Sequence, residues 1–397
     1  MLSTKRPRAT QAGTTLAAIL ALTTIGGSVL AAPFTLGNLV VSRVGVGGTG
    51  STILTSAATA VFLDEFTTTG TLVQTLALPT TGTGAFTLSG TASSEGALTL
   101  SANPSTQAQV LTIAGYNAAA GVTGIASTTS TVAPRVVDVI SADGTTITAV
   151  PQGTNFSGNN IRSAISADGT GTTIYASGAS TGVVYSSTSI GSSPTVVSST
   201  VPSERVLNIF GGDLYFSTGS GTVRGIYKAG GGLPTTTGNT STIFIDTGAS
   251  SSPYDFYFAS ANTVYIADDR ASATATPLVP GGGGLLKYVN SGGTFTLSNT
   301  YNLAGVTSGF AGLRGLTGNG TDIFGISTDN RLVDFNIGSS GFTTLATAAT
   351  NTAFRGVDAS PAPEPSQVAG LGFFAFGLAG VILKARRKRS TAPVDAR

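Results

Sequence analysis

The sequence feature that most constrains the fold is a recurring unit of four short β-prone runs. The runs are rich in Val, Ile, Phe, Tyr and Thr, and turns rich in Gly, Asn, Asp and Ser separate them. This spacing is typical of antiparallel sheets, and four runs in roughly 40–65 residues match the size of a propeller blade. Clear units begin near residues 160, 205, 254 and 312, and a looser one begins near residue 97. The pattern predicts an all-β propeller.

The two ends of this body predict how the propeller closes. Residues 38–76 supply three runs, and residues 354–358 supply a single final run that is similar in form to residues 313–316. Three runs and one run complete a sixth unit if the ends of the chain pair, which removes exposed sheet edges. We therefore expect six blades over residues 33–360, with seven blades or a pair of β-sandwiches as alternatives.

The composition excludes several classes of chemistry. The 397 residues include no Cys and no His, so disulfides, thiolate nucleophiles, imidazole bases and zinc sites with nitrogen or sulfur ligands are not available. The formal charge is +2, but residues 33–365 carry 17 acidic and 11 basic side chains. Because this body is acidic, with a net charge of −6, we expect no nucleic-acid partner.

The N-terminal 31 residues have the order of a secretory signal peptide. Lys5, Arg6 and Arg8 precede an apolar stretch at residues 16–25, and small residues follow at 28–32. This order predicts export by the general secretion machinery and cleavage by signal peptidase after Ala31. A buried N-terminal helix is the alternative.

The C-terminal segment 361–389 has three consecutive features. Pro363, Glu364 and Pro365 form a stiff extended spacer, sixteen apolar residues follow at 368–383, and a Lys/Arg cluster occupies 384–389. The apolar run is just under the usual length of a membrane-spanning helix. The basic cluster would hold its end in the cytoplasm. We therefore predict a transmembrane helix with a basic stop.

The order of Pro363-Glu364-Pro365, a short Gly/Phe-rich helix and a basic cluster resembles the PEP-CTERM sorting signal of Gram-negative bacteria. The resemblance covers the last 35 residues. It implies that exosortase, a membrane protease-transpeptidase, recognises the tripeptide and removes the helix. It also implies a transient inner-membrane anchor and then a location at the cell surface or outside the cell. A plain single-pass anchor would share the helix and the stop, but it has no need of Pro-Glu-Pro.

Candidate binding residues lie on the runs expected to line the central channel, since the first strand of each blade faces the axis. Arginines stand near the start of four of these runs, at Arg162, Arg205, Arg314 and Arg355, and acids occupy neighbouring positions at Glu95, Glu204 and Asp255. Guanidinium groups hold carboxylates or sulfates by paired hydrogen bonds. We expect these side chains to meet at one channel mouth, where an acidic sugar or an acidic loop of a partner could bind. The alternative is that the arginines pair with acids or strand-end carbonyls and only tie blades together.

Other motifs favour structural roles. Asp268 and Asp269 could contribute to a Ca²⁺ site, but the surrounding residues lack the Asp-x-Asp-x-Asp spacing of a specific loop. A capped strand end or an ion pair with Arg270 is the expected role. The Asp-Gly pairs at 143–144 and 168–169 are turn signals, and residues 281–284 lack the Lys-Ser/Thr ending of a phosphate loop. We predict no metal site, no cofactor and no catalytic residue.

These observations favour a non-enzymatic surface or extracellular-matrix protein. Its body resembles the secreted propeller-like domains found ahead of PEP-CTERM tails, and it would bind extracellular polysaccharide or another surface protein. The alternative is a carbohydrate-active hydrolase or lyase that uses Glu95, Glu204 or Asp255, because propellers carry both kinds of function. Two carboxylates facing each other across a deep pocket would favour the enzyme. An arginine-lined mouth would favour binding.

Overall fold

The computed structural model describes residues 32–48, 50–103, 107–188, 193–272 and 283–362. The chain divides into Met1–Leu30 and Ala31–Arg397, and every described residue belongs to the second unit. The predicted signal peptide, the Pro-Glu-Pro tripeptide and the apolar run 368–383 lie outside the described residues. Within the described ranges no helix is long and apolar enough to cross a membrane.

The prediction of an all-β fold is confirmed. Four separate sheets each contain four antiparallel strands in chain order. They are β9 (Ile161–Ser166), β10 (Thr173–Gly178), β11 (Val183–Ser187) and β12 (Thr195–Ser198); β13 (Glu204–Phe210), β14 (Asp213–Thr218), β15 (Gly225–Lys228) and β16 (Thr242–Asp246); β17 (Pro253–Ser260), β18 (Thr263–Asp268), β19 (Gly284–Ser291) and β20 (Thr294–Tyr301); and β23 (Leu313–Gly318), β24 (Asp322–Ser327), β25 (Arg331–Asn336) and β26 (Gly341–Thr347). A small hairpin of β21 (Leu303–Ala304) and β22 (Phe310–Ala311) joins the last two sheets along the chain.

A nine-stranded sheet contains two further four-stranded units. One unit is β5 (Leu98–Ala102), β6 (Gln109–Tyr116), β7 (Arg135–Ser141) and β8 (Ile147–Pro151). The other is β27 (Ala353–Ala359), β1 (Leu39–Val44), β2 (Ala58–Phe66) and β3 (Leu72–Ala77), in which the last described strand pairs with the first. The short strand β4 (Thr87–Ser89) pairs with both β2 and β6 and so links the two units. The 3-10 helix η1 (Ile125–Ser127) lies between β6 and β7.

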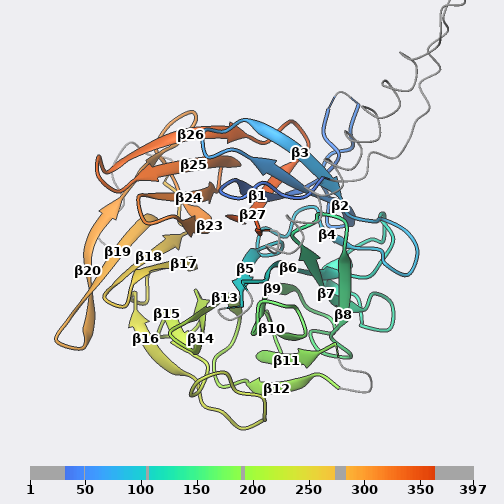
Figure 1. The fold of residues 1–397 in the computed structure, drawn as a ribbon, viewed down its shortest axis with the longest axis horizontal. Helices are drawn as coiled ribbons and strands as arrows, with labels where there is room; N and C mark the ends of the chain where they lie inside the picture. The colour runs from blue at the N-terminus through green and yellow to red at the C-terminus, as the bar shows by residue number, and fades with distance from the viewer. Residues whose placement is uncertain (1–31, 49, 104–106, 189–192, 273–282, 363–397) are drawn as a thin grey trace, which may run out of the picture. The chain divides into compact units, whose positions relative to one another are not determined.

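The six units are arranged in a propeller-like circle within this body (Figure 1). The innermost strands contact one another in the order β5, β9, β13, β17, β23 and β27, and β27 contacts β5 again. The strands β3, β8, β12, β16, β20 and β26 lie at the rim. The inner ends of all six units therefore meet around one centre.

The apolar core is divided among the junctions between neighbouring units. Six clusters of buried residues each combine side chains from two successive four-stranded units. We call the unit of β27, β1, β2 and β3 the closing unit. The cluster with Leu332 and Val357, for example, joins the β23–β26 sheet to the closing unit, and the cluster with Val40 and Leu111 joins the closing unit to the β5–β8 unit. Because burial of apolar surface is the main stabilising term, every junction contributes to closing the circle.

Two glycines allow the inner strands to approach closely. A Cβ on Gly356 of β27 would lie 2.5 Å from the Leu98 nitrogen and 2.7 Å from the Gly96 oxygen of the neighbouring unit. A Cβ on Gly315 of β23 would lie 3.1 Å from the Val357 nitrogen. Each glycine follows an arginine in the sequence, so the Arg-Gly pairs place a long basic side chain beside a close backbone contact.

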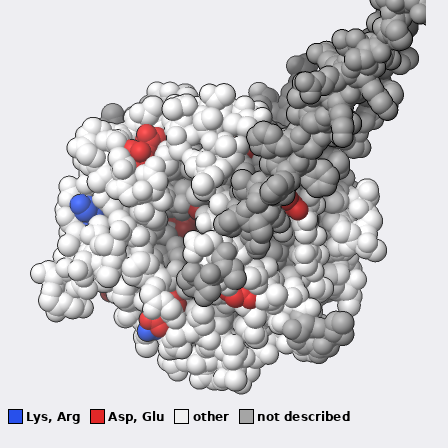
Figure 2. Space-filling view, viewed as in Figure 1, with Lys and Arg blue, Asp and Glu red and all other residues white. Residues whose placement is uncertain are grey.

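Charged side chains are sparse on the face drawn in Figure 2, where uncharged residues make up most of the visible surface. Acidic groups are visible in the hollow near the middle of this face, whereas the visible basic groups lie nearer its edge. Only 10% of the residues are charged, so the few places where charges gather are informative about function.

Candidate functional site

The four predicted arginines gather around one buried tyrosine. Tyr254, the second residue of β17, is 4% exposed, and the charges of Arg162, Arg205 and Arg314 act on its phenol. Arg355 interacts electrostatically with the same phenol. We call Arg162, Arg205, Arg314 and Arg355 the arginine cluster. Each stands near the start of an innermost strand, which explains why side chains 193 residues apart in sequence meet.

Arg162 and Arg205 make the same contacts one unit apart. The Arg162 Nη1 donates to the main-chain oxygen and the hydroxyl of Ser203 at 3.2 and 2.9 Å, and to the main-chain oxygen of Glu204 at 3.2 Å. The Arg205 Nη1 donates to the main-chain oxygen and the hydroxyl of Ser252 at 3.2 and 3.1 Å, and to the main-chain oxygen of Pro253 at 2.8 Å. Both arginines therefore bind the backbone that enters the next inner strand.

Arg355 likewise binds a main-chain oxygen, at the junction between the closing unit and the β5–β8 unit. It is 7% exposed, and its Nη2 donates to the Gly90 oxygen at 2.7 Å. Burial lowers the pKa of this guanidinium. For these three arginines, the alternative role as ties between units is observed directly in their hydrogen bonds to main-chain carbonyls.

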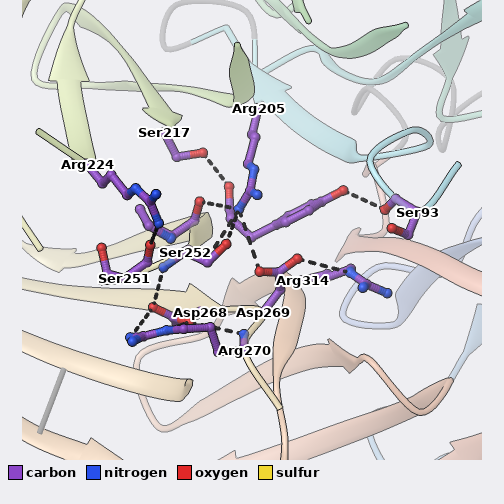
Figure 3. A network of polar contacts seen from close by, with 12 residues as sticks. Ser93, Arg205, Ser217, Arg224, Ser251, Ser252, Asp268, Asp269, Arg270 and Arg314 are labelled. Carbon is purple, nitrogen blue, oxygen red and sulfur yellow. Dashed lines mark hydrogen bonds and ion pairs between the residues drawn. The ribbon is translucent and has the colours of Figure 1, made fainter. Parts of the chain in front are cut away.

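Arg314 differs from the other three because its guanidinium group makes no hydrogen bond to a main-chain carbonyl of the described residues. Its Nε, like those of Arg162 and Arg355, is buried without a hydrogen-bond partner there, and it approaches the Asp269 Oδ2 only to 3.6 Å. Asp269 also faces the Arg205 Nη1, at 3.8 Å from its Oδ1 (Figure 3). The side chains of Arg205, Asp269 and Arg314 are 18%, 19% and 23% exposed, so solvent reaches all three.

Backbone packing sets the position of Asp269. The Asp269 amide donates to the Ser252 oxygen at 3.1 Å, just past the end of β18. A Cβ on Gly312 would lie 2.4 Å from the Asp269 carbonyl carbon, so the segment before β23 packs directly against this residue. The two contacts hold Asp269 between Arg205 on β13 and Arg314 on β23.

The neighbouring Asp268 has the structural role expected from the sequence. It is fully buried, its Oδ2 accepts the Ser252 amide at 2.9 Å, and its two oxygens accept the Arg270 Nε and Nη2 at 2.8 Å each. The prediction of a capped strand end with an ion pair is confirmed. No group of three or more acidic side chains that could hold a metal ion occurs in the described part of the chain.

Glu95 is a buried acceptor at the edge of the cluster. It is 1% exposed, and it accepts hydrogen bonds from the Ser89 amide, the Tyr116 hydroxyl and the Asn160 amide at 2.7, 2.6 and 2.5 Å. Burial raises the pKa of this carboxyl, and these bonds together with the charge of Arg355 oppose the rise. Its oxygens are occupied by the protein itself.

Glu204 is also 1% exposed, but its Oε2 has no hydrogen-bond partner in the described residues. Burial raises the pKa of Glu204 to about 8, although Arg162 lowers it. At neutral pH most of this carboxyl is therefore protonated, and it offsets little of the positive charge of the cluster.

Asp255 does not join the cluster, contrary to the expectation that all seven candidate residues converge. Its Oδ1 accepts the Phe256 amide at 2.7 Å, and its Oδ2 accepts the Leu316 amide of β23 at 2.8 Å. Successive strand residues point to opposite faces, so Asp255 faces away from the side occupied by Tyr254. Burial raises the pKa of Asp255 well above its usual range.

Tyr254 and Asp269 are the site residues that sequence reasoning missed. Tyr254 occupies on β17 the position that Arg162 and Arg205 occupy on their strands, and its ring lies 4.9 Å from the Arg205 guanidinium carbon. Its hydroxyl donates to the Ser93 oxygen at 2.6 Å, across the centre of the body. Alignment of the inner strands by this position would have identified Tyr254, whereas no local pattern identifies Asp269 as a partner of two distant arginines.

An open cavity of about 550 Å³ lies along the β1–β2 connection and the start of β2. Its lining contains only Gly, Ala, Ser, Thr, Val, Ile and Leu, including the exposed Val46 and Ile53. It contains no carboxylate, so it cannot supply the acid pair that glycoside hydrolysis requires. The arginine cluster is the better candidate site.

The fold and the cluster define an all-β, propeller-like protein with a cationic centre. No model of a known protein family matches the sequence, and no curated protein matches it either. Among solved structures, the chain is similar to a chain of a nidogen/laminin complex, with a TM-score of 0.48 and 11% identity over 81% of this chain and 98% of that chain. It is also similar to a putative 6-phosphogluconolactonase from Bacteroides uniformis, with a TM-score of 0.40 and 10% identity over 81% of this chain and 99% of that chain.

Proposed function

We propose that this chain is an exported six-bladed propeller that acts at the cell surface or in the extracellular matrix by binding rather than by catalysis. The observation that carries the binding role is the partly exposed arginine cluster, in which Arg314 keeps unpaired donors. The acids predicted beside it are buried or occupied by the protein's own hydrogen bonds. Such a centre is suited to holding an anion, and extracellular polysaccharide is the proposed ligand.

The route of presentation rests on the terminal segments. Residues 1–31 would direct export and be removed by signal peptidase after Ala31. Pro363, Glu364 and Pro365 would then be recognised by an exosortase-type protease while residues 368–383 hold the protein in the inner membrane. Release would leave the body at the surface or outside the cell.

The strand directions fit such a presentation. The Ser360 amide, just after β27, donates to the Asn38 oxygen, just before β1, at 2.9 Å, so both ends of the body lie side by side. Arg355 stands four residues before the end of β27 at Ala359, which along a strand corresponds to about 13 Å. A membrane that held either end of the body would therefore leave the arginine cluster on the distant side, facing a ligand.

The sorting step is tested by changing Pro363, Glu364 and Pro365 together to Ala in a host that carries an exosortase. Intact mass and membrane fractionation should show that the wild-type protein loses the segment beyond the tripeptide and leaves the membrane, while the variant retains it. Retention of residues 368–383 by both proteins, with both in the membrane fraction, would mean that the tripeptide is only a spacer. The protein would then be an anchored propeller.

A further inference from the structure

Asp269 balances part of the charge of the arginine cluster without occupying its hydrogen-bond donors. Its oxygens lie 3.8 Å from the Arg205 Nη1 and 3.6 Å from the Arg314 Nε. A hydrogen bond between a guanidinium and a carboxylate has a length of about 2.7–2.9 Å. The Arg270–Asp268 pair next to it, with both contacts at 2.8 Å, shows what a fully formed pair looks like in this chain (Figure 3).

Buried donors of the cluster have no partner in the described part of the chain. These donors are the Nε atoms of Arg162, Arg314 and Arg355. Buried donors are almost always paired in folded proteins, and an unpaired one lowers the stability of the fold. Four guanidinium groups therefore surround Tyr254 with more donors than the protein satisfies.

The charge of the cluster is also incompletely balanced. Asp269 is the acid that forms ion pairs with its members within the described residues, and it contacts only Arg205 and Arg314. Glu204 stands beside Arg162, but burial raises the pKa of this carboxyl to about 8. An incoming anion would therefore supply both charge and acceptor oxygens that the chain lacks at this point.

We propose that Arg314 and Arg205 bind one anionic group, a carboxylate or a sulfate, of an acidic polysaccharide, and that Asp269 is the internal counter-ion that this group displaces. The inference rests on the proposed binding function and names its ligand chemistry. The three side chains are each about one-fifth exposed, so an anion on a flexible sugar chain can reach them. Arg162 and Arg355, which are tied to backbone carbonyls, add positive potential without moving.

The proposal is tested by calorimetric titration of the full-length chain in detergent with three probes. They are a galacturonic acid tetramer, its neutral methyl ester and a sulfated tetrasaccharide of the same length. Wild-type protein should bind the carboxylated or the sulfated probe and bind the ester at least about tenfold more weakly, because the ester lacks the charge that pairs with the guanidinium groups. The stronger of the two acidic probes identifies the natural anion.

Two variants distinguish an anion site from a structural tie. Arg314→Gln should weaken binding of the acidic probe by about tenfold or more, because hydrogen bonds to charged groups are among the strongest single contacts. Asp269→Asn should strengthen binding by several-fold, because it removes the competing carboxylate. Lys228→Gln is the control, since it removes the same charge from a partly exposed pair with Asp213 on other strands, and it should leave binding unchanged.

The outcomes separate this proposal from the broader one. If Asp269→Asn and Arg314→Gln both bind the acidic probe more weakly than wild type, or if neither changes its binding, the proposal that the anion displaces Asp269 is wrong. Equal binding of the ester and the acidic probe, unaffected by Arg314→Gln, would leave a polysaccharide-binding propeller whose site lies elsewhere. Thermal unfolding of each variant shows that the compared proteins are folded.

Discussion

The same inner strands carry two sets of ionisable side chains whose hydrogen bonds are satisfied in opposite ways. Along β17 and β27, the oxygens of Asp255 and Asp358 are paired within the protein. The oxygens of Asp255 accept the Phe256 and Leu316 amides, and those of Asp358 accept the Leu100 amide, the Ala359 amide and the Thr317 hydroxyl. In the arginine cluster three Nε atoms and the Glu204 Oε2 have no partner within the described residues.

Under the proposed function, the difference separates side chains that hold the fold together from side chains that bind a ligand. An ionisable side chain whose hydrogen bonds are complete contributes to holding neighbouring strands together, as Asp358 does between β27, β23 and β5. A cluster with unpaired donors costs stability, and the proposed binding of an external anion would offset that cost. Substitutions at the two places should therefore have different consequences, and the following predictions test this.

The largest loss of stability is expected where backbone meets backbone at the closing junction. Gly356→Ala would place a Cβ 2.5 Å from the Leu98 nitrogen, and neither strand can move without opening the contact between β27 and β5. We expect a loss of about 3 kcal/mol in the free energy of unfolding, measured by urea titration. Gly84→Ala is the matched control, because no atom lies within 4 Å of its added Cβ. Similar stabilities for both variants would contradict a tight central ring.

A smaller loss is expected at the complete carboxylate site. Asp358→Ala leaves the Leu100 amide and the Thr317 hydroxyl without their acceptor in a partly buried place, which should cost about 2 kcal/mol. Burial raises the pKa of Asp358 to about 6, so the free energies of unfolding of wild type and Asp358→Ala should be compared at one fixed pH. A loss no larger than that of Arg314→Gln would remove the contrast between the two sets of charges.

Glu204 should make the stability of the protein depend on pH. Its folded pKa of about 8 lies above the usual value of a glutamate, so the folded state binds more protons than the unfolded state between pH 4.5 and 8. Stability from this group is complete below about pH 4.5 and is lost as the pH rises through 8. Glu204→Gln should therefore be more stable than wild type at pH 8.5, by about 1 kcal/mol, and not at pH 5.

The control for this pH dependence is Asp213→Asn. Lys228 lowers the pKa of Asp213, so this carboxyl is ionised in the folded and unfolded states throughout the range from pH 5 to 8.5. Chemical unfolding of the three proteins at several pH values provides the measurement. A Glu204→Gln protein with the same pH profile as wild type would show that Glu204 is ionised when folded.

The sequence predicts much of this fold because each unit repeats a local signal. The first strands at residues 161, 204 and 313, and the single last strand at 353–359, follow from β-prone runs bounded by turns. The positions of Arg162, Arg205, Arg314 and Arg355 near the starts of these strands then bring them together by symmetry.

The rest of the site depends on contacts that no local pattern records. Asp255 was expected at the channel mouth, but the alternation along β17 directs Tyr254 toward the cluster and Asp255 away from it. Asp269 reaches the cluster because β18 ends against Gly312, which is a contact between segments 43 residues apart. The hydrogen bonds that separate Arg314 from the other arginines depend on side-chain positions that the sequence alone does not determine.

The smallest effect is expected at Arg314 itself. Arg314→Gln breaks no hydrogen bond of its Nε and only a 3.6 Å ion pair that is partly exposed, so it should change the free energy of unfolding by about 0.5 kcal/mol or less. Arg205→Gln breaks three hydrogen bonds to Ser252 and Pro253 and should cost about 1–2 kcal/mol. Urea titration of both proteins at low and high salt gives the comparison, since screening weakens the ion pair that each arginine forms with Asp269, whereas the larger loss in Arg205→Gln comes from its hydrogen bonds. If Arg314→Gln lowers the free energy of unfolding as much as Arg205→Gln does, the arginine cluster serves the fold alone. The unpaired donors would then need an explanation other than a ligand.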